Sequence, residues 1–178
     1  MLTQPRLFPL EDEQLDAETR DLLGAGAGLN IFRTLAHHPK LLKRWLVFGN
    51  HVLAKSTLPA RERELVILRT GWLCRAEYEW GQHVVIGRTA GLGDDEVRRI
   101  GAGPDGGWGV RDRALLQACD ELHADSFVSD ATWTALSAHY DAKQLLDILF
   151  TIGQYTLVSM VLNSLGVQPE PGLPRFPS

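Results

Sequence analysis

The chain has 178 residues, of which 44% are hydrophobic, and its formal net charge is −4. This length and apolar content support a single domain with a sizeable core. The acidic balance, without any dense run of lysine and arginine, argues against a nucleic-acid-binding surface. Two cysteines are too few for a disulfide framework, and residues 1–16 lack the apolar stretch of a signal peptide, so we expect a cytoplasmic protein.

The N-terminal part begins with an arm and a modest helix. Residues 1–10 are predicted to be extended because Pro5 and Pro9 block regular structure. Residues 11–23 form a modest helix, which the glycine-rich run 24–28 ends. This run lacks the Lys-Ser/Thr pair and the preceding strand of a phosphate-binding loop, so it predicts a flexible turn.

A strongly amphipathic helix follows over residues 39–54. His51 lies within it as a possible pocket residue, although a single histidine on such a helix is more often partly buried and satisfied. The adjacent His37 and His38 point in different directions on a helix, which argues against a metal site there.

Two successive helices over residues 59–92 organise the rest of the chain. The first begins near Pro59, whose fixed φ suits a first helical turn. Its apolar face repeats at helical spacing through Leu65, Leu68 and Trp72. Glu62 is expected at the surface. Glu64 lies at the edge of the apolar face, where both a buried and a solvated carboxylate fit the pattern.

The second helix is predicted over residues 74–90, ending at a glycine C-cap. One stripe of this helix, at steps of three and four, consists of Ala76, Glu79, His83, Gly87 and Ala90. The other members are small, as a closely packed inner face requires, so Glu79 and His83 are expected to point inward and to touch. Such a pair is frequently an acid–base site, and the alternative is a buried ion pair that only orients the helices.

The C-terminal part contains the longest apolar stretch, residues 143–165. Its length approaches that of a membrane span, but Asp147, Gln154 and Asn163 interrupt it, which favours a buried helix or a subunit interface. The loop 103–109 places Trp108 either in the core or over a pocket, and the tail 169–178 is extended. No stretch shows strand alternation, so the fold is predicted to be all-α.

Three segments carry a resemblance to a known family: RERELVILRT (61–70), EYEWGQHV (77–84) and AGLGDDEV (90–97). They resemble the core of the carboxymuconolactone decarboxylase family, which also contains the AhpD-type alkylhydroperoxidases. The resemblance implies one AhpD-like helical domain over residues 1–178, with the N-terminal arm 1–10 and the tail 169–178. It also implies a homo-oligomer, a trimer or hexamer, and no cofactor.

The two branches of this family differ at the position of the expected site. The thiol peroxidase branch has C-x-x-C ahead of the histidine and a glutamate on the preceding helix. On this sequence the thiols fall at Ala76 and Glu79, the glutamate at Glu64 and the histidine at His83. Both redox thiols are therefore absent, and Cys74 is two positions too early. The decarboxylase branch has E-x-x-x-H here, which Glu79 and His83 match.

The resemblance therefore implies a cofactor-independent lyase acting on a small carboxylated lactone or a related enolisable acid. His83 is expected to donate a proton, Glu79 to hold its tautomer and raise its basicity, and Glu64 to act as a second relay carboxylate. Further expected substrate-binding residues are Tyr78, Trp80 and Tyr155. An arginine would match a substrate carboxylate, and the candidates are Arg69, Arg75 and Arg88.

Three alternatives remain open on the sequence. One is an AhpD-like hydroperoxide reductase, which the absent C-x-x-C disfavours. Another is a non-catalytic protein that binds a small acid. The last is a metal site built from Glu64, Glu79 and His83, for which the ligand spacing gives thin support, so no metal is predicted. The expected partner is a small-molecule substrate, with no nucleic acid and no membrane.

Overall fold

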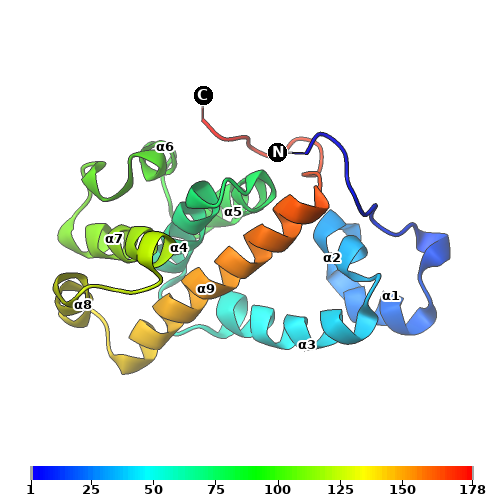
Figure 1. Cartoon of the computed structure of the whole chain (residues 1–178), viewed down its shortest axis with the longest axis horizontal. Helices are drawn as coiled ribbons and strands as arrows, with labels where there is room; N and C mark the ends of the chain where they lie inside the picture. Colours follow the sequence, from blue (N-terminus) through cyan, green and yellow to red (C-terminus); the bar gives the residue numbers. More distant parts are fainter. Residues whose placement is uncertain (1, 178) are drawn as a thin grey trace.

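The computed structural model describes residues 2–177, and helices form all of the regular structure in this part of the chain (Figure 1). The predicted all-α fold is confirmed. The α-helices are α1 Ala17–Leu23, α2 Asn30–Leu35, α3 Pro39–Asn50, α4 Ala60–Leu73, α5 Glu77–Thr89, α6 Asp94–Arg99, α7 Val110–Asp125, α8 Asp130–Ser137 and α9 Ala142–Leu165. Shorter segments are the 3-10 turns Asp12–Gln14, Gly24–Gly28 and Ile100–Asp105, and the π-helical turn His51–Lys55.

Helix α4 lies at the centre of the fold and packs against α5, α7 and α9. Its four successive residues Leu65, Val66, Ile67 and Leu68 are almost fully buried, and successive residues of a helix point to different sides, so other elements surround this part of α4. Helix α9 runs diagonally across the molecule, with α6–α8 on one side and α1–α3 on the other (Figure 1). It thus connects the two halves of the bundle.

The junction between α4 and α5 differs from the prediction. Arg75 has a left-handed backbone, with φ of 52°, and so interrupts the helical path. Helix α5 consequently begins at Glu77, three positions later than expected from the spacing. This sharp turn brings the inner face of α5 back onto α4, which is the arrangement that the site needs.

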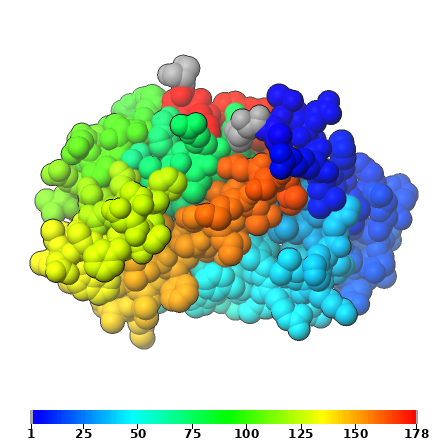
Figure 2. All heavy atoms as spheres, in the orientation of Figure 1, coloured from blue at the N-terminus to red at the C-terminus, as the bar shows by residue number. Residues whose placement is uncertain are grey.

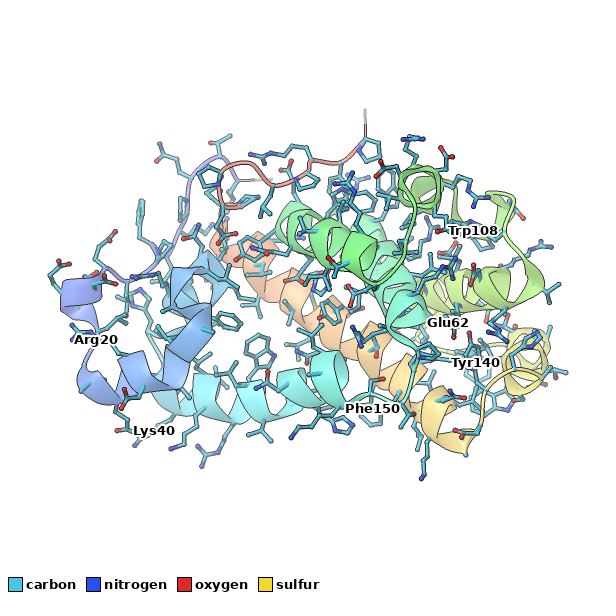
Figure 3. The ribbon with its side chains drawn as sticks, turned by 180° about the vertical axis from the view of Figure 1, so that it is seen from behind. Arg20, Lys40, Glu62, Trp108, Tyr140 and Phe150 are labelled. Carbon is cyan, nitrogen blue, oxygen red and sulfur yellow. The ribbon has the colours of Figure 1, made fainter. Side chains whose placement is uncertain are left out.

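The prediction that Glu62 is a surface carboxylate is wrong. Its side chain is only 6% exposed and accepts a hydrogen bond of 2.8 Å from the hydroxyl of Tyr140. The guanidinium of Arg111 lies 3.1 Å from the other carboxylate oxygen. Figure 3 shows Glu62 and Tyr140 close together at the junction of α4 with the start of α9. Glu62 is therefore a structural anchor between distant segments.

Trp108 belongs to the core rather than to a pocket. It packs against the main hydrophobic cluster and donates a hydrogen bond of 3.0 Å to the carbonyl of Gly103. The guanidinium of Arg99 lies 4.4 Å from the centre of its ring, a cation–π contact. The irregular segment 103–109 is therefore held by its tryptophan.

The C-terminal tail packs against its own chain. The indole N–H of Trp80 donates to the carbonyl of Arg175 at 3.0 Å, and the ring of Phe176 lies 5.1 Å from those of Trp72 and Trp80. The N-terminal arm runs beside the start of the tail, where Gln168 donates to the carbonyl of Leu2. Figure 2 shows the two terminal segments along the same edge of the molecule.

Helix α9 has the length and hydropathy of a membrane-crossing helix, but half of its most apolar window is buried inside the fold. Its outer face exposes large apolar side chains, namely Leu146, Phe150, Leu157 and Met160. These features fit the predicted core helix with an exposed apolar side. Assembly into a homo-oligomer stays a prediction.

Candidate active site

A cavity of about 130 Å³ lies between α2, α3, α5 and α9. Most of its wall is apolar, and the polar side chains come mainly from α5 and α9. The wall consists of Leu29, Ile31, Phe32, Trp45, Leu46, Gly49, Asn50, Leu53, Tyr78, Glu79, Gln82, His83, Ile86, Gln154, Tyr155 and Val158. The inward stripe predicted for α5 therefore faces a hollow through Glu79 and His83.

His83 is held between two carboxylates. Its Nδ1 lies 2.7 Å from Oε2 of Glu64 on α4, and its Nε2 lies 3.4 Å from Oε2 of Glu79 one turn earlier on α5. Glu64 has no exposed surface, and His83 is 5% exposed. The structure thus brings together the three residues that were predicted to be catalytic.

The contacts of the two glutamates with His83 differ from each other. Glu64 makes the short bond to Nδ1, so it orients the imidazole ring and favours a proton on Nδ1. Glu79 lies in the cavity wall on the Nε2 side, at a distance longer than an ordinary hydrogen bond. Glu79 and Nε2 are therefore the groups that a ligand in the cavity can reach.

The charge on His83 follows from its neighbours. Burial alone would lower the pKa of His83, but the carboxylates of Glu64 and Glu79 outweigh burial and raise it to about 9. The imidazole is therefore protonated at neutral pH. Arg63 lies behind this group, with Nη2 3.1 Å from Oε1 of Glu64, and balances part of the buried negative charge.

Two tyrosines belong to the polar part of the wall as neutral groups. The ring of Tyr155 meets the His83 imidazole edge to face, with 4.8 Å between the ring centres, and burial raises the pKa of its hydroxyl. Burial also raises the pKa of Tyr78, whose hydroxyl donates to Glu170 at 2.9 Å. Both predicted tyrosines lie in the cavity wall.

Trp80 and the candidate arginines, which were predicted to bind the substrate, lie outside the wall of this cavity. Trp80 faces the C-terminal tail, on the other side of α5 from the cavity. Arg69 forms a bidentate ion pair with Asp120, with distances of 2.6 and 2.7 Å. Arg75 is exposed at the α4–α5 junction, and Arg88 pairs with an exposed aspartate at the far end of α5. Of the described residues that line the cavity, none is lysine or arginine.

Several wall residues escaped the sequence reasoning. Gln82 lies between Glu79 and His83 on α5, and its place on the same face was recognisable from the helical spacing. Trp45 and Gln154 come from α3 and α9, and no local pattern connects them with α5. Asn163, which also lies on α9, is outside the cavity wall, and its side-chain amide donates a hydrogen bond to the carbonyl of Cys74.

Neither cysteine lines the cavity. Cys119 is fully buried, and burial raises its pKa to about 12. Burial also raises the pKa of Cys74, whose sulfur lies 4.0 Å from Nδ1 of His123. Both thiols are therefore protonated at neutral pH, whereas the thiolate is the reactive form.

Nδ1 of His83 is paired with Glu64, and Nε2 faces Glu79 at 3.4 Å. Among residues 2–177, no group of three or more histidine, cysteine, aspartate or glutamate side chains has an arrangement suited to a metal ion.

Residues 39–120 match the model of the Carboxymuconolactone decarboxylase family. The chain is similar to this family over this region. The region runs from α3 into α7 and includes Glu64, Glu79 and His83. Among curated proteins, none matches the sequence significantly.

Solved structures share the fold over nearly the whole chain. The alkylhydroperoxidase AhpD core of an uncharacterised peroxidase-related protein from Ralstonia eutropha JMP134 has a TM-score of 0.82 and 21% identity, covering 96% of this chain and 95% of that one. A peroxidase-related protein from Silicibacter sp. TM1040 has a TM-score of 0.77 and 15% identity, with 96% of each chain covered. The debrominase Bmp8 has a TM-score of 0.79 and 12% identity, covering 96% and 95%. The AhpD-like fold is thus confirmed beyond the family region.

Proposed function

We propose that this chain is a member of the carboxymuconolactone decarboxylase family and a cofactor-independent lyase or isomerase that moves a proton on a small enolisable compound. The observation that carries the proposal is the His83–Glu79 pair in the wall of a mostly apolar cavity, with Glu64 fixed behind the imidazole. A poorly solvated acid and base side by side suit general acid–base catalysis.

The two groups that face the cavity have complementary roles. Glu79 accepts the proton from the carbon next to a carbonyl group, and the C–H electron pair moves onto the carbonyl oxygen. Nε2–H of His83 donates to that oxygen, because the raised pKa keeps the imidazole protonated at neutral pH. Glu64 stabilises the imidazolium and holds the ring in place. Return of the proton from Glu79 to a different carbon gives the isomer.

Decarboxylation of a carboxylated lactone or related enolisable acid is the lyase form of the same chemistry. The bond to the carboxylate breaks, CO₂ leaves, and the electron pair stays on the enolate, which His83 then protonates. The family match supports this form. The cavity wall gives it less support, since His83 is the cation nearest to a bound carboxylate and is already paired with two glutamates.

The hydroperoxide reductase is a weaker candidate because both cysteines lie outside the cavity wall. Its test is peroxide consumption, with Cys74→Ser as the control. A non-catalytic binding protein would hold a small ligand in the cavity without exchanging its protons.

Exchange of α-protons with D₂O, followed by ¹H NMR on a panel of small ketones and lactones, tests the proposal. We expect His83→Ala to lose exchange by about 10²–10⁴-fold, the range typical of a positioned acid or base. His51→Ala is the matched control, because His51 is exposed and outside the cavity wall, and it should exchange as the wild type does. Undiminished exchange by His83→Ala would refute the mechanism.

A further inference from the structure

The size of the cavity limits the substrate. Its volume of about 130 Å³ is close to that of an engineered protein cavity of roughly 150 Å³ that holds benzene. The part of a ligand that lies inside the cavity therefore has roughly six to eight non-hydrogen atoms. Because aliphatic and aromatic side chains form most of the wall, the body of this ligand is apolar.

The charges around the cavity limit the substrate further. His83 lies between Glu64 and Glu79, and Arg63 is paired with the same Glu64 carboxylate. Two cations are thus matched by two anions, and neither cation is free to receive a ligand carboxylate. The glutamate that reaches the cavity is Glu79, so an anionic ligand would meet a negative charge in a poorly solvated place.

Neutral hydrogen-bonding groups are present instead. The hydroxyl of Tyr155 and the amide of Gln154 belong to wall residues and can donate to a carbonyl oxygen. The wall residue Trp45 has a buried indole N–H that finds no hydrogen-bond partner among the described residues. A buried donor without a partner is stabilised by a ligand that brings an acceptor.

We propose, building on the proton-transfer function above, that the cavity selects small, neutral carbonyl compounds with an apolar body and rejects carboxylates of the same size. Ketones and simple lactones belong to this class. The reaction is then an isomerisation or another proton transfer on a neutral carbonyl compound, rather than the loss of CO₂ from an acid.

A pair of ligands with the same shape tests this selectivity. In pentanoate a charged oxygen replaces one methyl group of 2-hexanone, and the rest of the molecule is unchanged. In NMR titrations at pH 7.5 we expect 2-hexanone to bind and pentanoate to bind at least about tenfold more weakly. Glu79→Gln removes the negative charge from the wall, so it should strengthen pentanoate binding at least about tenfold.

Two neighbouring positions on α5 show whether binding occurs in the cavity. Ile86 lines the cavity, whereas Val85 points to solvent. Ile86→Trp fills the hollow and should abolish 2-hexanone binding, while Val85→Trp should leave it unchanged, with circular dichroism confirming that both variants are folded. Equal loss in both variants, or no loss in either, would overturn the assignment to this cavity.

The binding and exchange measurements separate the two proposals. Binding of pentanoate as tight as that of 2-hexanone overturns the selectivity, whatever the activity. Binding of 2-hexanone without α-proton exchange contradicts the proton-transfer function and leaves the selectivity standing. Faster exchange of pentanoate than of 2-hexanone contradicts the selectivity and leaves the function standing.

Discussion

The bond between Glu64 and His83 makes the stability of this protein depend on pH. The pKa of His83 is about 9 in the folded chain, against an ordinary value of 6.5. Because the folded value is the higher one, the stabilisation is fully present below pH 6.5 and is lost as the pH rises through about 9. At about 1.4 kcal/mol for each pKa unit, this difference corresponds to about 3 kcal/mol.

Glu64→Gln should remove most of this dependence. The variant loses the carboxylate 2.7 Å from Nδ1 and keeps Glu79 at 3.4 Å, and burial then opposes the charge on His83. Urea unfolding at pH 6 and pH 9.5, followed by tryptophan fluorescence, measures the effect. The wild type should lose about 3 kcal/mol of unfolding free energy between these values, and the variant less than about 1 kcal/mol.

Glu62→Gln is the matched control, because it changes a second buried glutamate of α4 that contacts Tyr140 and Arg111 rather than His83. It should lower the stability by a similar amount at both pH values and keep the difference between them. The buried thiols also contribute to the pH dependence of the unfolding free energy. Their contribution is the same in both variants, so it cancels when the variants are compared. Stability that is independent of pH in the wild type, or an undiminished dependence in Glu64→Gln, would refute the reasoning.

Three further changes probe the surroundings of the site. Glu170→Gln weakens the bond to the Tyr78 hydroxyl and should cost about 1–2 kcal/mol in urea unfolding, and an unchanged midpoint would contradict this. Arg69→Ala leaves Asp120 without its bidentate partner and should lower the unfolding free energy by about 3–5 kcal/mol. The α-proton exchange rate of the folded variant should be unchanged, and a loss of exchange in folded protein would show that Arg69 acts in the site. Phe176→Ala uncovers the tryptophans beneath the tail and should shift their emission to longer wavelength, whereas an unshifted spectrum would show that the tail does not cover them.

The parts of the structure that depend on local spacing could be predicted from the sequence. The all-α class follows from helical periodicity and the absence of strand alternation. The contact between Glu79 and His83 follows from their separation by one helical turn, and so does their common direction with Ala76 and Gly87. In each of these cases one helix contains all of the information.

The parts that depend on how helices cross could not be predicted. Which glutamate meets Nδ1 is decided by the contact of α4 with α5, after the turn at Arg75. Glu62 is buried because Tyr140, which lies 78 positions away, supplies a hydroxyl. Arg69 pairs with Asp120 and so points away from the candidate site, and no sequence pattern connects these two residues.

The protonation state of His83 is the most direct test of the central claim, and ¹⁵N NMR of histidine-labelled protein measures it at each ring nitrogen. Between pH 6 and pH 8 both nitrogens should give imidazolium shifts, with the transition to the neutral ring near pH 9. A His83 ring that is neutral at pH 7.5 would contradict the account, because no acid would then face the cavity.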